Sequence, residues 1–185
     1  MIAVIFDTET TGLIQNHSMS LNQQPEVIEF YAAQVELETG KIIREYDTLI
    51  KPSRKLSDVP AFGDKKTITQ MTGITNEMLE DQPSFKDVAD NIRSILLQGE
   101  YVIAHNVSFD CEMIDIEYER LKQSLMWPEV ICTVEASAYL NGGRLSLTKL
   151  HEYLFGTQFK DAHRAKPDCQ ALIRCTLELF KRGAI

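Results

Sequence analysis

Apolar and polar residues in the first fifty positions follow patterns that predict β-strands. Residues 2–7 form a short apolar run before the turn-prone segment 10–12, which indicates a buried first strand. Residues 26–38 and 41–50 are rich in β-branched and aromatic side chains and predict two more strands. Thr39-Gly40 between them is a turn signal, so we expect these two strands to pair as a hairpin.

A long loop is followed by a segment whose apolar residues recur with the period of a helix. Residues 51–66 are polar, with two prolines and one glycine, and predict the loop. A helix is expected to begin at Ser84, where Asp87 is placed for a capping box, and to end at Gly99. Its buried face is formed by Phe85, Val88, Ile92 and Ile95.

Short strands and helices alternate in the rest of the chain. Residues 101–104 and 130–133 predict two short strands. Helices are expected near residues 106–123, 134–140, 147–155 and 167–181. Asn106 or Ser108 can cap the first of them, and Gly183 stops the last. This order of elements predicts an α/β domain with a mixed sheet, antiparallel early and parallel later.

Composition fits one soluble domain. The length of 185 residues suits a single compact unit, residues 1–185, and 44% apolar with 25% charged residues is ordinary for a globular protein. The opening apolar run, 1–6, is much shorter than the roughly 20 residues that span a bilayer, and it lacks the basic start of a secretory signal. We therefore expect a cytoplasmic protein with no membrane partner.

Charge and cysteine content narrow the function classes. The net charge of −8 argues against a protein that holds long nucleic acid by a broad basic face, but not against an enzyme that grips a strand end. The basic residues are scattered, and Arg164 and Lys166 are the main candidates to meet phosphates. Four cysteines without C-x-x-C pairing lie in apolar segments, as reduced core thiols do: Cys111, Cys132, Cys169 and Cys175.

Two carboxylates follow the first strand. Asp7 and Glu9 are two residues apart, so in an extended strand they project to the same face, in a row with Ala3 and Ile5. Adjacent carboxylates repel unless they are protonated or bind cations, and oxygen ligands favour Mg²⁺ or Mn²⁺. Taken alone, the pair also fits a polar strand end entering a turn, or a phosphatase-type motif.

Two more acids stand at predicted helix starts. The helix dipole alone favours an acid in the first turn, by roughly 0.3–1 kcal/mol. However, each acid leads an apolar row and should therefore face inward. The rows are Asp110 with Ile114 and Tyr118, and Asp168 with Leu172, Cys175 and Leu179. An inward carboxylate is costly unless it is paired or binds a metal.

The three segments together predict one catalytic site. Four carboxylates converging at strand and helix ends would form a two-cation site that cleaves a phosphodiester. His163 stands five residues before Asp168. A histidine in a loop is usually an ordinary surface residue, but in this place it is a candidate general base.

These motifs resemble the DEDDh exonucleases, the DnaQ-like family that includes proofreading subunits. The first motif is Phe6-Asp7-Thr8-Glu9-Thr10-Thr11-Gly12-Leu13 and the second is Ala104-His105-Asn106-Val107-Ser108-Phe109-Asp110. The third is His163-Arg164-Ala165-Lys166-Pro167-Asp168. The stretch 68–85 and Cys132-Thr133 also resemble the family, so the resemblance covers nearly the whole chain.

The resemblance implies a ribonuclease-H-like three-layer domain, with a central mixed five-stranded sheet flanked by helices. It implies removal of nucleoside 5′-monophosphates from the 3′ end of nucleic acid, with DNA favoured and single strands expected, and a polymerase or repair complex as a partner. Two Mg²⁺ or Mn²⁺ ions would be held by Asp7, Glu9, Asp110 and Asp168, with His163 as the base. The residues implied to bind substrate are Thr10, Thr11, Gly12, Leu13, His105, Asn106, Phe109 and His163.

Two departures and two alternatives qualify this interpretation. Residues 13–24 form a longer polar insertion than many members carry, and Lys166-Pro167 before Asp168 is unusual. One alternative is a binding module that keeps the fold without catalysis, although such a module would not need His163. The other is a metal-dependent phosphatase with Asp7 as nucleophile, which leaves the acids of the second and third motifs unexplained.

Overall fold

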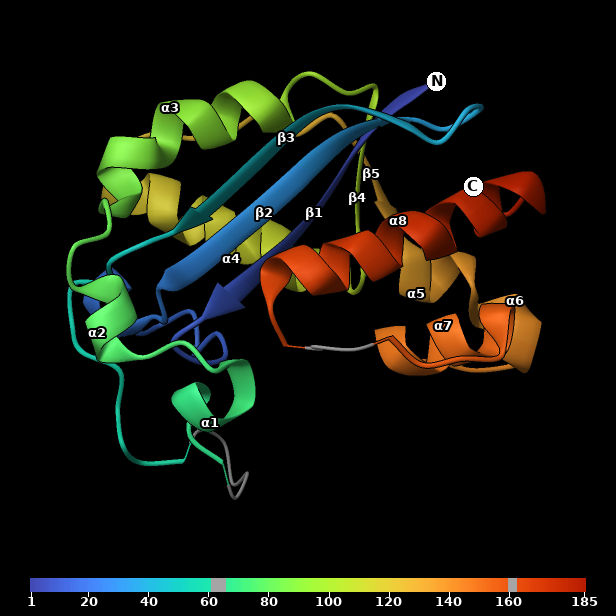
Figure 1. Ribbon diagram of the computed structural model, residues 1–185. Coiled ribbons are helices and arrows are strands. Elements are labelled where there is room, and N and C mark those ends of the chain that lie inside the picture. The colour runs from blue at the N-terminus through green and yellow to red at the C-terminus, as the bar shows by residue number, and fades with distance from the viewer. Residues whose placement is uncertain (61–65, 160–162) are drawn as a thin grey trace.

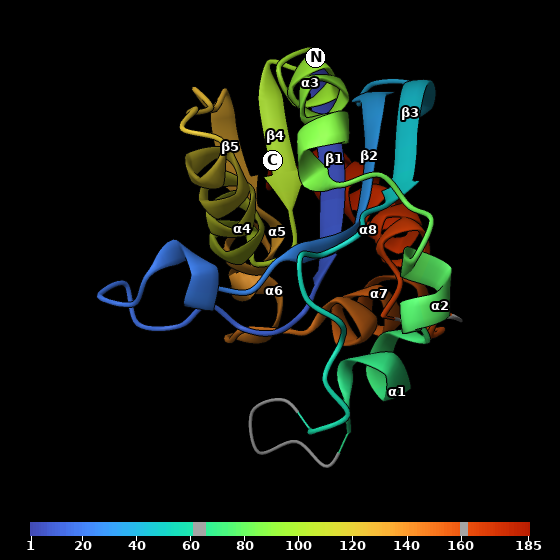
Figure 2. The same ribbon diagram turned by 90° about the vertical axis from the view of Figure 1, so that its left-hand side faces the viewer.

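The computed structural model describes residues 1–60, 66–159 and 163–185. Its centre is a five-stranded sheet in the order β3-β2-β1-β4-β5 (Figure 2). The strands are β1 Ile2–Thr10, β2 Val27–Glu36, β3 Lys41–Leu49, β4 Tyr101–Ala104 and β5 Glu129–Cys132. Pairing is antiparallel between β1 and β2 and between β2 and β3, and parallel between β1 and β4 and between β4 and β5. The predicted hairpin and the mixed sheet are therefore confirmed.

Eight helices and one 3₁₀ turn are present in the described part of the chain. The long helices are α3 Phe85–Leu96, α4 Val107–Arg120, α7 Leu147–Phe155 and α8 Ala165–Lys181. The short elements are η1 Leu21–Gln23, α1 Ile68–Thr72, α2 Asn76–Leu79, α5 Thr133–Ala136 and α6 Ala138–Asn141. None of these helices combines the length and the apolar character needed to cross a membrane.

Several predicted boundaries were wrong. The expected helix at 134–140 is two short helices, α5 and α6, that meet at Ser137. The first strand continues to Thr10, because β2 pairs with it along its whole length. The helix begun at Ser84 ends at Leu96 rather than at Gly99. Gly99 is instead needed for close approach, because a Cβ there would lie 2.9 Å from the backbone nitrogen of Val4.

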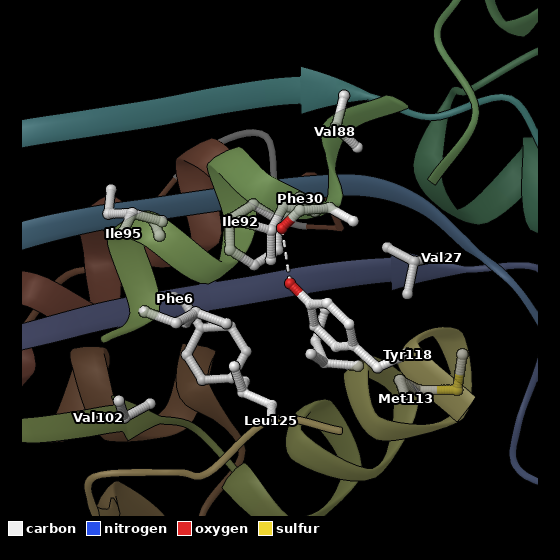
Figure 3. Close-up of a cluster of buried hydrophobic side chains, with 14 of the residues drawn as sticks. Phe6, Val27, Phe30, Val88, Ile92, Ile95, Val102, Met113, Tyr118 and Leu125 are labelled. Carbon is white, nitrogen blue, oxygen red and sulfur yellow. Dashed lines mark hydrogen bonds between the residues drawn. The ribbon is translucent and has the colours of Figure 1, made fainter. Parts of the chain in front are cut away.

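Successive side chains of each strand point to opposite faces of the sheet, so the hydrophobic core has two layers, one on each face. On one face, Phe6 of β1 and Phe30 of β2 pack against α3 and α4. Figure 3 shows this layer, in which the hydroxyl of Tyr118 donates to the carbonyl of Ala89 at 2.7 Å. On the other face, Ile5 and its neighbours pack against α8, which crosses the sheet in Figure 1. The arrangement is the three-layer domain that the family resemblance implied.

The layers bring three separate segments to one end of the sheet. β1 and β4 are parallel neighbours, so their carboxyl ends lie at the same edge. Helix α4 begins three residues after β4 ends, and α8 covers the opposite face from α4. The first turns of both helices therefore flank the end of β1, where Asp7 and Glu9 stand.

Candidate active site

Three of the predicted carboxylates form a compact cluster. Oxygen atoms of Asp7, Glu9 and Asp168 all lie within 4.8 Å of one another. Asp7 and Glu9 project from β1 on the face that also carries Ala3 and Ile5, as the alternation predicted. Asp168 comes from the first turn of α8, and all three side chains are half-buried.

The fourth carboxylate reaches the same region from the other face. Asp110 lies in the first turn of α4 and is 4% exposed, so it faces inward as its apolar row predicted. Its Oδ1 accepts hydrogen bonds from the Thr8 backbone nitrogen at 3.1 Å and from the Thr8 hydroxyl at 2.7 Å. Thr8 lies between Asp7 and Glu9 in β1, so these two bonds hold Asp110 beside the cluster.

Burial and mutual repulsion make the cluster reluctant to ionise. Burial, followed by the charge of Asp110, raises the pKa of Asp7 well above its usual range. Burial and then the charge of Asp168 raise the pKa of Glu9 to about 8. Burial raises the pKa of Asp110 to about 7 against the hydrogen bonds from Thr8, and raises that of Asp168 to about 6. A cation would reverse this balance, because it stabilises the charged carboxylates.

The cluster also has the chemistry of a hard-cation site. Carboxylate oxygens are the donors that Mg²⁺ and Mn²⁺ prefer. Asp168 Oδ1 is buried and has no hydrogen-bond partner in the described structure, while Oδ2 accepts from the His163 backbone nitrogen at 2.9 Å. A buried oxygen without a partner is costly in a folded protein unless a ligand completes it. The residues present therefore fit divalent cations.

His163 stands at the margin of the site. Its side chain is exposed, and its backbone is left-handed with φ of 71°. The backbone hydrogen bond to Asp168 ties it to the start of α8. No side-chain contact within the described residues fixes the imidazole ring, so its place beside the cluster follows from the backbone alone.

Arg164 and Lys166, the main candidates to meet phosphates, are both paired with protein carboxylates. Arg164 forms a bidentate ion pair with Glu29, which is 2% exposed. The Lys166 Nζ lies 3.2 Å from Asp47 and above the ring of Tyr31. Sequence reasoning missed Glu29, although a single acid inside the mostly apolar run 27–35 was a signal that it had a buried partner.

The turn after β1 is held by its own hydrogen bonds. The Thr10 hydroxyl donates to the carbonyl of Gly12 at 2.7 Å, and Thr11 exchanges two hydrogen bonds with the backbone of Glu26. Leu13 is half exposed, and a shallow pocket of about 370 Å³ is lined by Thr11, Gly12 and Leu13 together with residues of the insertion. The turn thus leaves Leu13 as an exposed apolar side chain in the wall of this pocket.

In the second motif, His105 contacts other parts of the protein. Both ring nitrogens of His105 lie 3.0 Å from protein oxygens, those of the Thr133 hydroxyl and the Leu145 carbonyl. His105 therefore ties the end of β4 to the segments around α5 and α7, although it was expected to contact substrate. Asn106 has left-handed backbone, with φ of 68°, and its Oδ1 accepts from Arg144. Phe109 is half-buried against the core layer of α3 and α4.

The insertion after β1 is anchored by one arginine. The Arg120 guanidinium donates to the carbonyls of Leu21, Gln24 and Pro25 at 2.8 to 3.0 Å. Glu117 pairs with Arg120 at 2.9 Å and accepts from the Val27 backbone nitrogen. Sequence reasoning missed this pair, whose only signal was opposite charges three residues apart at the end of a helix.

Known proteins resemble the chain over nearly its whole length. It matches the exonuclease family model RNase_T over residues 4–176. It is 32% identical over 181 residues to the 3′-5′ exonuclease DinG of Bacillus subtilis (strain 168), which covers 97% of this chain and 18% of that protein. It is 34% identical over 170 residues to the DNA polymerase III PolC-type of Staphylococcus haemolyticus (strain JCSC1435), covering 91% and 10% respectively. The chain thus spans a small part of these relatives' length.

A solved structure supports the fold. The nuclease domain of 3′hExo, a DEDDh family member bound to rAMP, superposes with a TM-score of 0.75 at 16% identity and covers 99% of this chain and 93% of that one. At this identity the likeness shows the ribonuclease-H-like fold alone. The family match and the two relatives go further and confirm the family predicted from the three motifs. The chain belongs to the exonuclease family.

Proposed function

We propose that residues 1–185 form a single 3′-to-5′ exonuclease domain that removes nucleoside 5′-monophosphates from the 3′ end of nucleic acid. One observation carries the proposal: three carboxylates from β1 and α8 gather within 4.8 Å, with the buried Asp110 beside them. Family membership supports the reaction class. The expected cytoplasmic location stays a prediction.

The four carboxylates would together hold two Mg²⁺ or Mn²⁺ ions. Asp7 and Glu9 of β1, Asp168 of α8 and Asp110 of α4 would supply the carboxylate oxygens. When bound, two such ions activate the attacking water and stabilise the leaving oxygen of a phosphodiester. Because β1 and the two helix starts are fixed by the core, the carboxylates are positioned before substrate arrives.

His163 is the proposed general base. Imidazole changes its charge state near physiological pH, so it can take a proton from water and return it to solvent. Its exposed side chain suits the return step, and the hydrogen bond to Asp168 keeps it beside the cluster. The water oxygen forms a new bond to phosphorus and the bond between phosphorus and the 3′ oxygen breaks; this oxygen takes a proton from solvent, which leaves the shortened strand with a 3′-hydroxyl.

The turn after β1 is the proposed binding site of the terminal nucleotide. Backbone groups of Thr10, Thr11 and Gly12 would hold it, and Leu13 would pack on its base. Asn106 and Phe109 would line the groove beside the second motif. His105 would act through its bonds to Thr133 and Leu145, setting the backbone of Asn106.

The nucleic acid itself is proposed to be DNA, with single strands preferred. PolC is named as a DNA polymerase, whereas 3′hExo is bound to a ribonucleotide, so both sugars have precedent in the family. A polymerase or repair complex is the proposed setting, because the PolC relative carries a matching segment within a much longer protein.

A 5′-labelled oligonucleotide tests the proposal. With Mg²⁺ or Mn²⁺ we expect stepwise shortening of the labelled strand, with nucleoside 5′-monophosphate as product. The assay is run on matched single-stranded DNA, duplex DNA and RNA. If every strand stays full length with both metals, the chain is a binding module and the proposal is wrong. Release of p-nitrophenol from p-nitrophenyl phosphate without strand shortening would instead support the phosphatase alternative.

A further inference from the structure

Glu29 is a buried carboxylate that the proposed reaction does not use. It lies within β2, is 2% exposed, and stands directly opposite Glu9 in the antiparallel pair. Directly opposite residues project from the same face of a sheet, so Glu29 adds another negative charge beside the cluster. Burial is the main cause of the raised pKa of Asp7, Glu9 and Asp168, and the charge of Glu29 adds to it. Such a charge destabilises the folded protein unless a partner compensates it.

The compensation comes from the start of α8. Arg164 Nε lies 3.0 Å from both carboxylate oxygens of Glu29, and Arg164 Nη2 lies 2.6 Å from one of them. The Ala165 backbone nitrogen donates to Glu29 Oε2 at 2.8 Å. This amide belongs to the first turn of α8, where backbone donors have no partner within the helix. Glu29 therefore accepts hydrogen bonds both from the guanidinium of Arg164 and from a backbone N–H group at the start of α8.

These contacts leave Glu29 unsuited to bind a metal. Both of its oxygens already accept charge-assisted hydrogen bonds, which are the strong class. Among the described residues, the carboxylates that gather at metal-ligand spacing are those of Asp7, Glu9 and Asp168, without Glu29. The same contacts occupy Arg164, which is then not free to grip a phosphate.

The pair instead joins β2 to the segment that carries two functional groups. Arg164 directly follows His163, whose backbone nitrogen donates to Asp168 Oδ2. The ion pair fixes Arg164, and the hydrogen bond links His163, which precedes it, to Asp168, which follows it in the first turn of α8. The first turn of α8 is thus fixed to the sheet at Glu29, one strand away from the carboxylates of β1.

We propose that the Glu29–Arg164 ion pair is a positioning pair, which fixes the start of α8 against β2 and thereby sets where the aspartate and the histidine of the third motif stand. The inference rests on the proposed function, since it concerns the same site. It assigns Arg164 to the support of the site and not to substrate binding. A lysine cannot replace it, because an ammonium lacks the planar fork that meets both oxygens.

Three variants test the pair: Glu29→Gln, Arg164→Lys and Arg164→Ala. Displacing catalytic groups by about 1 Å can lower turnover about 100-fold, and loss of a group that orients metal ligands costs about 10–100-fold. We expect kcat to fall by at least about 10-fold in each variant, with KM for the oligonucleotide within about two-fold of the parent. Methylguanidinium should restore part of the kcat of Arg164→Ala, since a groove of about 560 Å³ opens beside Arg164.

The matched control is Arg182→Ala, which removes an exposed ion pair with Glu178 on the same helix. We expect this variant to keep the parent's kcat. A rise in KM alone in Arg164→Lys would assign Arg164 to phosphate binding and overturn the proposal. Unchanged kcat in both Glu29→Gln and Arg164→Lys would also overturn it. So would loss of the Mn²⁺-induced rise in melting temperature in Glu29→Gln, because that would make Glu29 a metal ligand.

The stability of the variants separates this proposal from the proposed function. If the parent shortens no strand, the exonuclease proposal fails, and the pair is tested by melting temperature alone. The shifts caused by Glu29→Gln and Arg164→Lys should then be non-additive in the double variant, because each breaks the same contact. Additive shifts would show that the two side chains do not act together, which would overturn the positioning pair.

Discussion

Glu9 should destabilise the metal-free protein at neutral and alkaline pH. Its pKa rises from 4.5 to about 8 on folding, chiefly through burial and then through repulsion from Asp168. A raised carboxyl pKa means that the folded protein binds the proton more tightly than the unfolded chain. The cost of ionising Glu9 is therefore absent below about pH 4, grows as the pH rises, and is complete above about pH 8.

The magnitude follows from the rise in pKa. At roughly 1.4 kcal/mol for each pKa unit, ionising Glu9 within the folded protein costs on the order of 5 kcal/mol. That is a large share of the roughly 5–15 kcal/mol by which a domain is stable. Glu9→Gln keeps the shape and removes the charge, so the metal-free variant should be more stable than the parent at pH 8. At about 2–4 °C for each kcal/mol, we expect its melting temperature to be roughly 10–20 °C higher.

Thermal denaturation in EDTA from pH 4 to pH 8 measures this effect. The melting temperature of the parent should fall across this range more steeply than that of Glu9→Gln, and the two proteins should converge near pH 4. Glu129→Gln is the matched control, because Glu129 is exposed on β5 and its loss should leave the pH dependence unchanged. If Glu9→Gln melts at or below the parent at pH 8 without metal, the repulsive cluster is refuted.

Three further predictions concern the metal, the base and the core. Mn²⁺ at about 100 times its dissociation constant should stabilise the parent by roughly 2.7 kcal/mol, and Asp7→Ala should blunt the resulting rise in melting temperature; an equal rise in both would remove Asp7 from the site. His163→Ala should keep the Mn²⁺ response and lose turnover in the oligonucleotide assay, and unchanged turnover would disprove its role as base. Tyr118→Phe removes the hydroxyl that donates to the Ala89 carbonyl, which keeps its hydrogen bond within α3, so urea denaturation should show a loss of about 0.5–1.5 kcal/mol. A loss below that range would mean that water replaces the hydroxyl.

Periodicity was enough to predict the elements that carry the site. Strand alternation set Asp7 and Glu9 on one face, and the apolar rows behind Asp110 and Asp168 turned both acids inward. These inferences hold because the core dictates them: a one-residue shift would expose a whole row of apolar side chains. The short helices α1 and α2 escaped prediction, because a single turn holds too few residues to show a period, and α5 and α6 were predicted as one helix.

Side-chain contacts between residues far apart in the chain could not be predicted from the sequence. The acid at position 29 and the arginine at position 164 are 135 residues apart, and no local pattern links them. The same holds for Arg120, whose three carbonyl partners lie 95 to 99 residues away. Local sequence reasoning finds a charged residue in an unusual place, but only the fold supplies the group that compensates it.

The position of β1 explains why the acids gather where they do. It is the strand at which the sheet changes from antiparallel pairing with β2 to parallel pairing with β4. Parallel pairing brings the start of α4 to its carboxyl end, and antiparallel pairing sets Glu29 opposite Glu9 so that it can hold the start of α8. One edge of one strand thus receives carboxylates from both faces of the sheet. Since those carboxylates repel, the fold keeps them together by the packing of α4 and α8, and the resulting strain is what divalent cations would relieve.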